Sequence, residues 1–258
     1  DYLGAVTMTA DAATRSGTGL VFVATPESVH RLVGGDVPEA IYRALPLRAN
    51  GEIDPSAAAR IALELSQRVT TVVIGPGLGQ TPATSEFLKI LLSQIDPGPS
   101  LVLDADALNI LSQTHNWWER LENETVLTPH PGEMGRLMGI SAAEVQKDRT
   151  AVVLEAARKF NATVVLKGSV TLTASPHGHL RVSQWVNSGL AKGGSGDVLA
   201  GLLGGLLAQQ PENVFDMASL AVFIHGYAAK AAREELGETG MRATDVSDRL
   251  GYFHRDWR

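Results

Sequence analysis

The sequence predicts an α/β protein with an open, mostly parallel sheet and helices on both of its faces. Short apolar runs recur along the chain, and stretches with helix signals separate them. Several of these runs lack the alternation of polar and apolar residues that a half-exposed strand shows, so they fit parallel strands covered on both sides. Strands that alternate with helices assemble into such a layered structure.

Five strands are expected at apolar runs that end near a proline, a glycine or a polar residue. They are Leu20–Ala24, Thr70–Ile74, Leu101–Leu103, Thr125–Leu127 and Thr163–Leu166. Two further runs, 170–174 and 180–186, alternate more and flank a Pro-His-Gly turn at 176–178, which predicts an antiparallel hairpin.

Three of the helices between the strands carry start signals. Asp54-Pro55 and Thr81-Pro82 each pair an N-cap residue with proline at the first helical position. Ser141 and Glu144 form a capping box that opens a helix towards Phe160.

The last part of the chain is also predicted to be helical. Its apolar residues favour one long buried helix at Val214–Leu236 and a final helix at Met241–Trp257. No repeat, low-complexity tract or linker divides the sequence. We therefore expect a single domain over residues 1–258.

Composition excludes several classes of function. The net charge of -6 argues against nucleic-acid binding, which favours a basic surface. The chain has no cysteine, so disulfides, thiolate metal sites and cysteine nucleophiles are excluded. The longest strongly apolar stretch, Val198–Ala208, has 11 residues, whereas a bilayer needs about 20. With no visible signal peptide, we expect no membrane contact and a cytoplasmic location. The chain opens at Asp1 without methionine, which suggests that an upstream segment was removed.

The segment at 193–196 is the most informative part of the sequence. Gly193, Gly194, Ser195 and Gly196 lead directly into the apolar run at 198–200, which indicates a helix. Glycine lets the backbone approach a ligand closely. The first N–H groups of a helix lack partners within it, so the segment predicts an anion site.

Asp197 places a carboxylate beside this anion site. A phosphoryl-transfer enzyme uses such a group as the base that accepts a proton from the attacking hydroxyl. The structural alternative is an acidic residue that stabilises the helix dipole. We favour the catalytic role, and expect the dipole to keep Asp197 ionised and therefore a weak base at neutral pH.

The loops after two other strands carry residues with two interpretations each. The glycines of Gly75–Gly79 permit backbone approach to a ligand, but also suit a tight connection to the next helix. Asp104 and Asp106 are able to hold Mg²⁺ through water, and one of them is equally suited to cap a helix.

Two further strand ends bring a histidine and a lysine to the same edge. Prolines on both sides of His130 make its loop rigid, so a ligand contact and a structural role are equally supported. Glu133 favours helix capping over binding of a metal-bound water. Lys167 is able to reach a phosphate or to remain a solvated strand end.

Five ordered motifs cover almost the whole chain. They are Gly75-Pro76-Gly77-Leu78-Gly79, Asp104-Ala105-Asp106-Ala107-Leu108-Asn109, Thr128-Pro129-His130-Pro131-Gly132-Glu133, Leu166-Lys167-Gly168, and the segment from Asn187 to Asp197. Together they resemble the ADP/ATP-dependent NAD(P)H-hydrate dehydratases, which have the ribokinase-like fold. The sequence departs from that family at Ser195, where threonine is usual, and lacks the glycine-rich lead-in before Tyr2.

The resemblance implies roles for individual residues. Asp197 would be the catalytic base, and Ala5, Gly79 and His130 would contact the hydrated dinucleotide together with it. The nucleotide cosubstrate would be held by two segments. These are Lys167, Gly168, Ser169, Val170 and Thr171 in the first, and Gly193, Gly194, Ser195 and Gly196 in the second. No metal ligand is assigned.

The implied activity is repair of NADHX and NADPHX, the hydrated forms of NADH and NADPH. Phosphorylation of the ring hydroxyl by ADP or ATP with Mg²⁺ would convert it into a leaving group. The resemblance favours ADP as donor, a homotetramer, and an epimerase that is fused or separate. Two alternatives are a small-alcohol kinase on the same fold and a non-catalytic nucleotide sensor.

Overall fold

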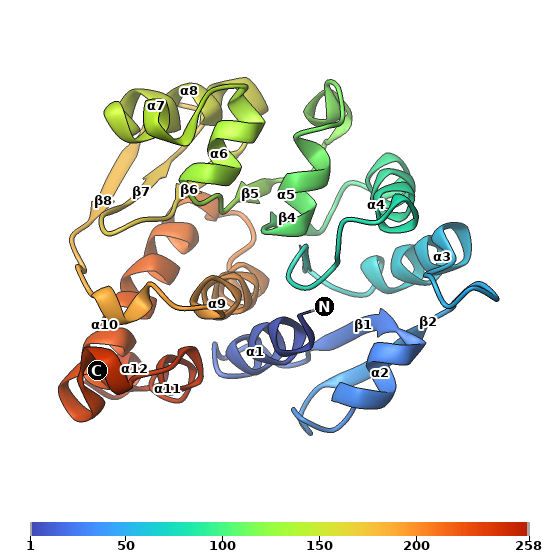
Figure 1. The fold of residues 1–258 in the computed structure, drawn as a ribbon, viewed down its shortest axis with the longest axis horizontal. Helices are drawn as coiled ribbons and strands as arrows, with labels where there is room; N and C mark the ends of the chain where they lie inside the picture. Colours follow the sequence, from blue (N-terminus) through green and yellow to red (C-terminus); the bar gives the residue numbers. More distant parts are fainter. Residues whose placement is uncertain (1, 257–258) are drawn as a thin grey trace.

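The computed structural model describes residues 2–256, and its main sheet has six strands in sequential order (Figure 1). The first four run parallel, and the last two complete the sheet as an antiparallel hairpin. This confirms the predicted mostly parallel sheet. The strands are β3 (Thr71–Ile74), β4 (Ser100–Leu103), β5 (Thr125–Leu127), β6 (Thr163–Leu166), β7 (Thr171–Ala174) and β8 (Leu180–Ser183).

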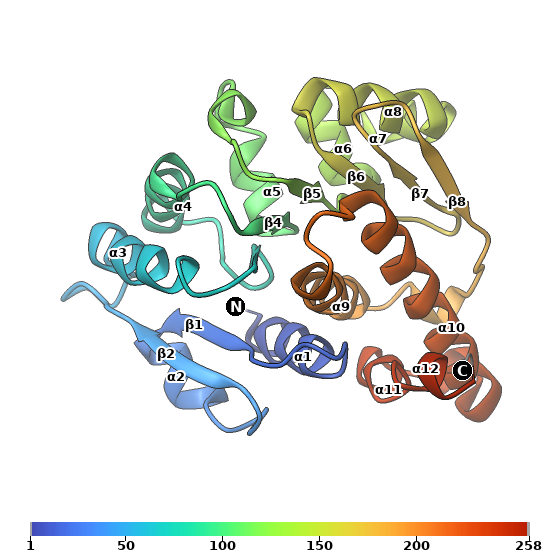
Figure 2. The same ribbon diagram turned by 180° about the vertical axis from the view of Figure 1, so that it is seen from behind.

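Helices cover both faces of this sheet, as the apolar strands required (Figures 1 and 2). Side chains alternate along a strand, so Leu101 and Leu103 enter one core cluster while Val102 enters the other. On the first face lie α3 (Pro55–Ser66), α4 (Pro82–Gln94), α5 (Asp106–Leu111), α6 (Pro131–Met138), α7 (Ala142–Lys147) and α8 (Arg149–Phe160). On the second lie α9 (Ser195–Gln209) and α10 (Val214–Gly240).

The sequential strand order decides where a site can form. Each helix that connects two parallel strands returns on the same side of the sheet, which follows from the right-handed crossover. Because these four strands are parallel, the carboxyl ends of β3, β4, β5 and β6 share one edge, and the loops that leave them lie there. Ligands of open α/β sheets bind outside this edge.

The first 45 residues differ from the prediction. The expected strand 20–24 lies at β1 (Phe22–Pro26), and it pairs in parallel with an unpredicted strand, β2 (Ile41–Leu45), in a separate two-stranded sheet. A short helix, α2 (Glu27–Val33), connects them. The polar and half-exposed pattern of β2, with Arg43 at its centre, gave no strand signal.

An unpredicted helix, α1 (Leu3–Thr14), packs along α9 through very small residues. A side chain at Gly201 would lie 2.1 Å from the carbonyl oxygen of Thr9, and one at Gly205 would collide with Ser16. Residue numbers rise together along this contact, so the two helices run in the same direction. Both helix N-termini therefore lie at the same end of the pair.

Two predicted helices are divided in the structure. The expected helix 141–160 begins with the predicted capping box, but breaks at Asp148, which caps α8 by accepting a hydrogen bond from the N–H of Ala151 at 3.0 Å. The expected final helix is two short ones, α11 (Ala243–Ser247) and α12 (Tyr252–Asp256), and Trp257 lies outside the described residues.

The long helix α10 is confirmed but is buried along only part of its length. Its buried residues end at Ala232, Leu236 is 45% exposed, and Gly237 interrupts the helical backbone. The caps predicted at Asp54 and Thr81 are both present. Two single-turn helices, η1 (Trp117–Arg120) and η2 (Ser188–Leu190), complete the described elements. Within residues 2–256 no helix is both long and apolar enough to cross a bilayer.

Candidate active site

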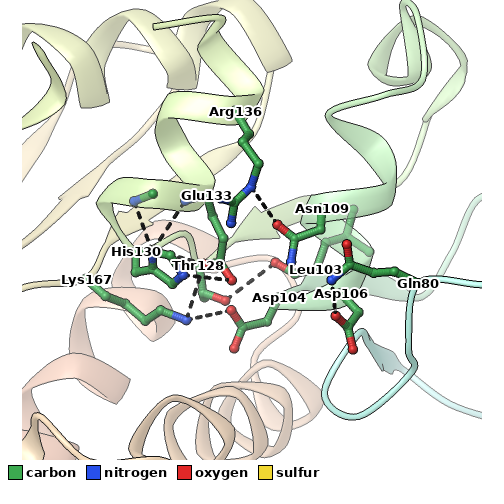
Figure 3. A network of polar contacts seen from close by, with 11 residues as sticks. Gln80, Leu103, Asp104, Asp106, Asn109, Thr128, His130, Glu133, Arg136 and Lys167 are labelled. Atoms are coloured by element: carbon green, nitrogen blue, oxygen red, sulfur yellow. Dashed lines mark hydrogen bonds and ion pairs between the residues drawn. The ribbon is translucent and has the colours of Figure 1, made fainter. Parts of the chain in front are cut away.

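Three charged side chains meet at the carboxyl edge of the sheet, and we call them the strand-end cluster: Asp104, Glu133 and Lys167 (Figure 3). The Nζ atom of Lys167 lies 2.6 Å from Oδ1 of Asp104 and 4.0 Å from Oε2 of Glu133. Burial alone would lower the pKa of Lys167, but the two carboxylates outweigh burial and raise it. Lys167 is therefore a paired cation, not a solvated strand end.

Asp106 holds the glycine loop after β3. Its carboxylate accepts hydrogen bonds from the N–H of Gly79 and from Nε2 of Gln80, both at 2.8 Å. The N-cap of α5 is Ala105, whose side chain makes no capping hydrogen bond, so the alternative that Asp104 or Asp106 caps this helix is wrong. Asp106 instead joins the ends of the neighbouring strands β3 and β4, and Asp104 joins the end of β4 to that of β6 across β5.

The loop 75–79 serves as a tight connection at its start. A side chain at Gly75 would lie 1.8 Å from the carbonyl oxygen of Asp104, which only glycine permits. Gly79 is different, because no atom lies within 4 Å of the position a Cβ would take. The structural interpretation is thus confirmed for Gly75, while the ligand contact of Gly79 stays a prediction.

His130 and Glu133 cap α6 reciprocally. Nδ1 of His130 accepts hydrogen bonds from the N–H groups of Gly132 at 3.0 Å and Glu133 at 3.3 Å. The carboxylate of Glu133 in turn accepts a hydrogen bond from the N–H of His130 at 2.8 Å, which confirms its predicted capping role. Burial, then Lys167 and Arg136, lower the pKa of His130.

The capping hydrogen bonds determine which ring nitrogen of His130 carries the proton. Because Nδ1 of His130 is an acceptor, the proton of the neutral ring is on Nε2. The side chain remains 51% exposed. His130 therefore has a structural role, and Nε2 of its half-exposed ring lies 3.4 Å from Oε1 of Glu133.

The glycine-rich segment forms the start of α9, as predicted. Gly194 is the N-cap with φ of +93°, and no side chain caps the first turn. Gly193 is exposed with no atom within 4 Å of a Cβ position. The hydroxyl of Ser195 is buried and has no hydrogen-bond partner among the described residues. This turn has the uncapped N–H groups that an anion site requires.

Gly196 brings the two halves of the site together. A Cβ on Gly196 would lie 3.3 Å from Nζ of Lys167 and 3.8 Å from Oδ2 of Asp104. The strand-end cluster thus lies against the first turn of α9. His225 of α10, which sequence analysis missed, is buried against the backbone of Ser195, and burial lowers its pKa to about 4.

Asp197 is half-buried in the same turn, and Thr9 of α1 donates a hydrogen bond to its carbonyl oxygen at 3.2 Å. Burial, and next the charge of Asp104, raise the pKa of the Asp197 carboxyl to about 6, although Lys167 opposes this. The expectation of a weak base held ionised by the helix dipole is therefore corrected. Asp197 is still mostly ionised at pH 7, but it accepts a proton far more readily than an ordinary aspartate.

The segment 167–171 is held from behind by Arg149, which sequence analysis also missed. Nη2 of Arg149 donates to the carbonyl oxygens of Leu166 at 3.1 Å, Lys167 at 3.3 Å and Val170 at 2.9 Å. Gly168 and Ser169 of this segment are exposed. An arginine in the first turn of a helix usually points to solvent, so no local signal predicted these contacts.

Ala5 lies next to the glycine loop but is only 5% exposed. Its Cβ lies 3.4 Å from the Cβ position of Gly77, which brings α1 against the loop 75–79. The predicted site residues at 5, 79, 130, 167 and 197 thus all lie along one edge. Among residues 2–256, no three side chains form a cluster suited to holding a metal ion.

Comparison with known proteins identifies the family of this chain. The family model of the NAD(P)H-hydrate dehydratases matches residues 1–251. The bifunctional NAD(P)H-hydrate repair enzyme of Moorella thermoacetica is 37% identical over 98% of this chain, and the chain spans 47% of that protein. The ADP-dependent (S)-NAD(P)H-hydrate dehydratase of Neisseria meningitidis is 44% identical over 72% of this chain and 63% of its own length.

A solved structure supports the fold over the full chain. The ADP/ATP-dependent NAD(P)H-hydrate dehydratase of Bacillus subtilis, crystallised with ATP and Mg²⁺, is 30% identical, with a TM-score of 0.82 over 100% of this chain and 88% of that one. The expected ribokinase-like fold is confirmed by this likeness. The chain therefore belongs to the NAD(P)H-hydrate dehydratase family.

Proposed function

We propose that this protein is an ADP-dependent (S)-NAD(P)H-hydrate dehydratase that restores NADH and NADPH from their hydrated forms. The observation that carries the proposal is the first turn of α9, which combines uncapped N–H groups, the adjacent Lys167 cation and a carboxylate whose pKa is raised to about 6. This combination suits transfer of a phosphoryl group to an alcohol. The family relationship indicates that this alcohol is the ring hydroxyl of the hydrated cofactor.

In the proposed reaction, Asp197 accepts the proton of the ring hydroxyl as its oxygen attacks the terminal phosphorus of the nucleotide. The bond from that phosphorus to the rest of the nucleotide breaks, so that AMP is released when ADP is the donor. The backbone N–H groups at 193–196 and the ammonium of Lys167 stabilise the charge on the transferring group. The lone pair of the ring nitrogen then expels phosphate. Loss of a proton from the adjacent ring carbon restores the double bond.

The remaining assigned residues would position the two substrates. Ala5, Gly79 and His130 would contact the hydrated dinucleotide, with the Nε2–H of His130 as a hydrogen-bond donor. The segment 167–171, supported by Arg149, would hold the nucleotide.

Mg²⁺ is compatible with this site as an ion carried by the nucleotide. It binds proteins through few ligands and keeps several waters when phosphates coordinate it. Asp104, Asp106 and Glu133 already accept the hydrogen bonds described above. We therefore assign the ion to phosphate oxygens and water, where it would offset phosphate charge.

The deciding experiment is incubation of the purified protein with NADHX and either ADP or ATP, followed by the absorbance of NADH. We expect NADH formation that requires a nucleotide, and faster formation with ADP. Phosphorylation without NADH formation would instead identify a small-alcohol kinase. Nucleotide binding without turnover would identify a sensor.

The assembly and context of the protein are part of the proposal. We propose a single domain over residues 1–258, a homotetramer, a cytoplasmic location and an epimerase, fused or separate, that supplies the reactive epimer of the hydrate. Light scattering of the purified protein tests the tetramer. An assay with an equal mixture of the two epimers of NADHX tests the epimerase, since without that activity only part of the substrate would react.

A further inference from the structure

We propose that Asp104 is a positioning residue that holds the Lys167 ammonium against the first turn of α9. The proposal rests on the function proposed above, because the cation assists catalysis only if a phosphoryl group is transferred at that turn. Asp104 itself is too deeply buried to meet a substrate, since it is 1% exposed. Its influence must therefore pass through neighbouring side chains, which are Lys167, to which it binds, and Asp197, whose pKa its charge raises.

The lysine side chain crosses a strand end to reach its partner. Lys167 follows β6 and Asp104 follows β4, with β5 between them. Lysine is a flexible stem that ends in a point charge, so it keeps a fixed position only where a partner holds it. Asp104 at 2.6 Å is that partner, because Glu133 lies at 4.0 Å.

Asp104 holds the ammonium next to the first turn of α9, where the anion site is predicted. The Cβ position of Gly196 lies 3.3 Å from Nζ of Lys167, so a side chain there would push the ammonium back by a few tenths of an ångström. The φ angle of Gly196 is not in the left-handed region, and backbone freedom does not account for glycine at this position. The close approach of Lys167 and Asp104 accounts for a residue without a side chain at this position.

Stability alone is a weak reason for such a pair. A buried ion pair usually contributes no more to folding than apolar residues of the same volume. If Asp104 lost its charge, the ammonium would keep only the weaker attraction of Glu133 and Asp197, or would lose its proton. In either case the transferring phosphoryl group would meet less positive charge.

A double-mutant cycle of Asp104→Asn and Lys167→Gln tests the proposal, because both substitutions keep a hydrogen-bonding side chain of similar shape. We expect kcat for NADHX conversion to fall about 100-fold in Lys167→Gln and at least about 10-fold in Asp104→Asn. In the double variant, kcat should match Lys167→Gln within about 2-fold when it is measured well above pH 6, where Asp197 is ionised with or without the charge of Asp104.

Asp106→Asn is the matched control from the same motif. Its carboxylate bonds to Gly79 and Gln80 and not to Lys167, so its effect should multiply with that of Lys167→Gln. Circular dichroism checks the fold of each variant. Should Asp104→Asn alone fail to fold, the comparison of Lys167→Gln with the double variant still decides, because the double variant removes both charges of the Asp104–Lys167 pair.

The proposal is overturned if Asp104→Asn keeps the wild-type kcat, or if its effect multiplies in full with that of Lys167→Gln. Failure of the proposed function would show separately, as a wild-type protein that forms no NADH. The same proteins are then titrated with ADP by calorimetry. Coupled losses of ADP affinity would support the role of Asp104, and independent losses would reject it.

Discussion

The strand-end cluster and the first turn of α9 lie in contact but differ in how their polar groups are satisfied. In the cluster, Asp104, Glu133 and Lys167 bind one another or nearby backbone, and Asp104 is almost fully buried. In the turn, no side chain caps the helix, and Asp197 has no side-chain hydrogen bond recorded among the described residues. The difference shows where a ligand would complete the structure.

In the proposed function, the cluster acts as a fixed charged support and the turn supplies the groups that react. Sites of this kind work when the groups that touch the substrate are held by a second layer that does not move. The raised pKa of Asp197 belongs to this contrast, because burial beside the cluster and the charge of Asp104 together produce it. Each prediction below changes one side of the contrast.

The largest effect is expected from Asp197→Asn, which removes the base and keeps the shape of the side chain. Turnover of NADHX should fall at least about 100-fold, the usual contribution of a general base. Folding and nucleotide affinity should stay near wild type, since Lys167 and the glycine turn are unchanged. Steady-state kinetics and calorimetry measure both, and wild-type turnover would remove Asp197 from the mechanism.

The pH dependence of kcat/KM tests whether Asp197 differs from an ordinary aspartate. A base must be deprotonated to act, and the pKa of Asp197 is raised to about 6. The value of kcat/KM should therefore fall about tenfold per pH unit below pH 6 and level off above it. An acidic limb that begins near pH 4 would show that burial beside the cluster has no effect on the base.

Local sequence signals were sufficient for the sheet and for the start of α9. Strands β3 to β6 are apolar runs bounded by polar or glycine residues, and the caps at Asp54, Thr81 and Ser141 are set by residues within three positions. The glycine segment before Asp197 is local in the same way. These features do not depend on distant parts of the chain.

Contacts between distant segments could not be predicted. Helix α1 packs on α9 across nearly two hundred residues through Gly201 and Gly205, so its apolar stripe is too narrow to give a clear helical pattern. The pairing of Asp104 with Lys167 spans 63 positions and depends on strand order. The pKa of Asp197 is raised by burial and next by the charge of the distant Asp104, which explains why a local argument from the helix dipole was wrong.

Arg149→Met should weaken nucleotide binding more than catalysis. Arg149 fixes the backbone of 166–170 through three carbonyl oxygens, and its loss would free a segment assigned to the nucleotide. We expect KM for ADP to rise about 5-fold and kcat to change less than about 2-fold, on the scale of one or two lost hydrogen bonds. Arg158→Met, on the exposed side of the same helix, is the control. Equal effects in both variants would contradict the role.

The smallest expected effect is on the free energy of unfolding, and it distinguishes the catalytic from the structural interpretation of Asp197. An aspartate that only stabilised the dipole of α9 would make the protein more stable when ionised, by about 0.3–1 kcal/mol. Burial acts in the opposite direction. Because the pKa in the folded state is raised from 3.8 to about 6, the folded protein holds the proton more tightly, and stability is lost as pH rises from about 4 to about 6.

This rise in pKa corresponds to at most about 3 kcal/mol, which partial exposure reduces to on the order of 1 kcal/mol. Asp197→Asn should therefore be more stable than wild type by on the order of 1 kcal/mol at pH 7.5, with the difference vanishing below pH 4. Urea unfolding at both pH values measures it. A variant that is less stable at pH 7.5 would mean that the dipole outweighs burial, and would restore the structural interpretation of Asp197. A more stable variant with lost turnover would mean that this protein gives up stability to keep a reactive base beside the strand-end cluster.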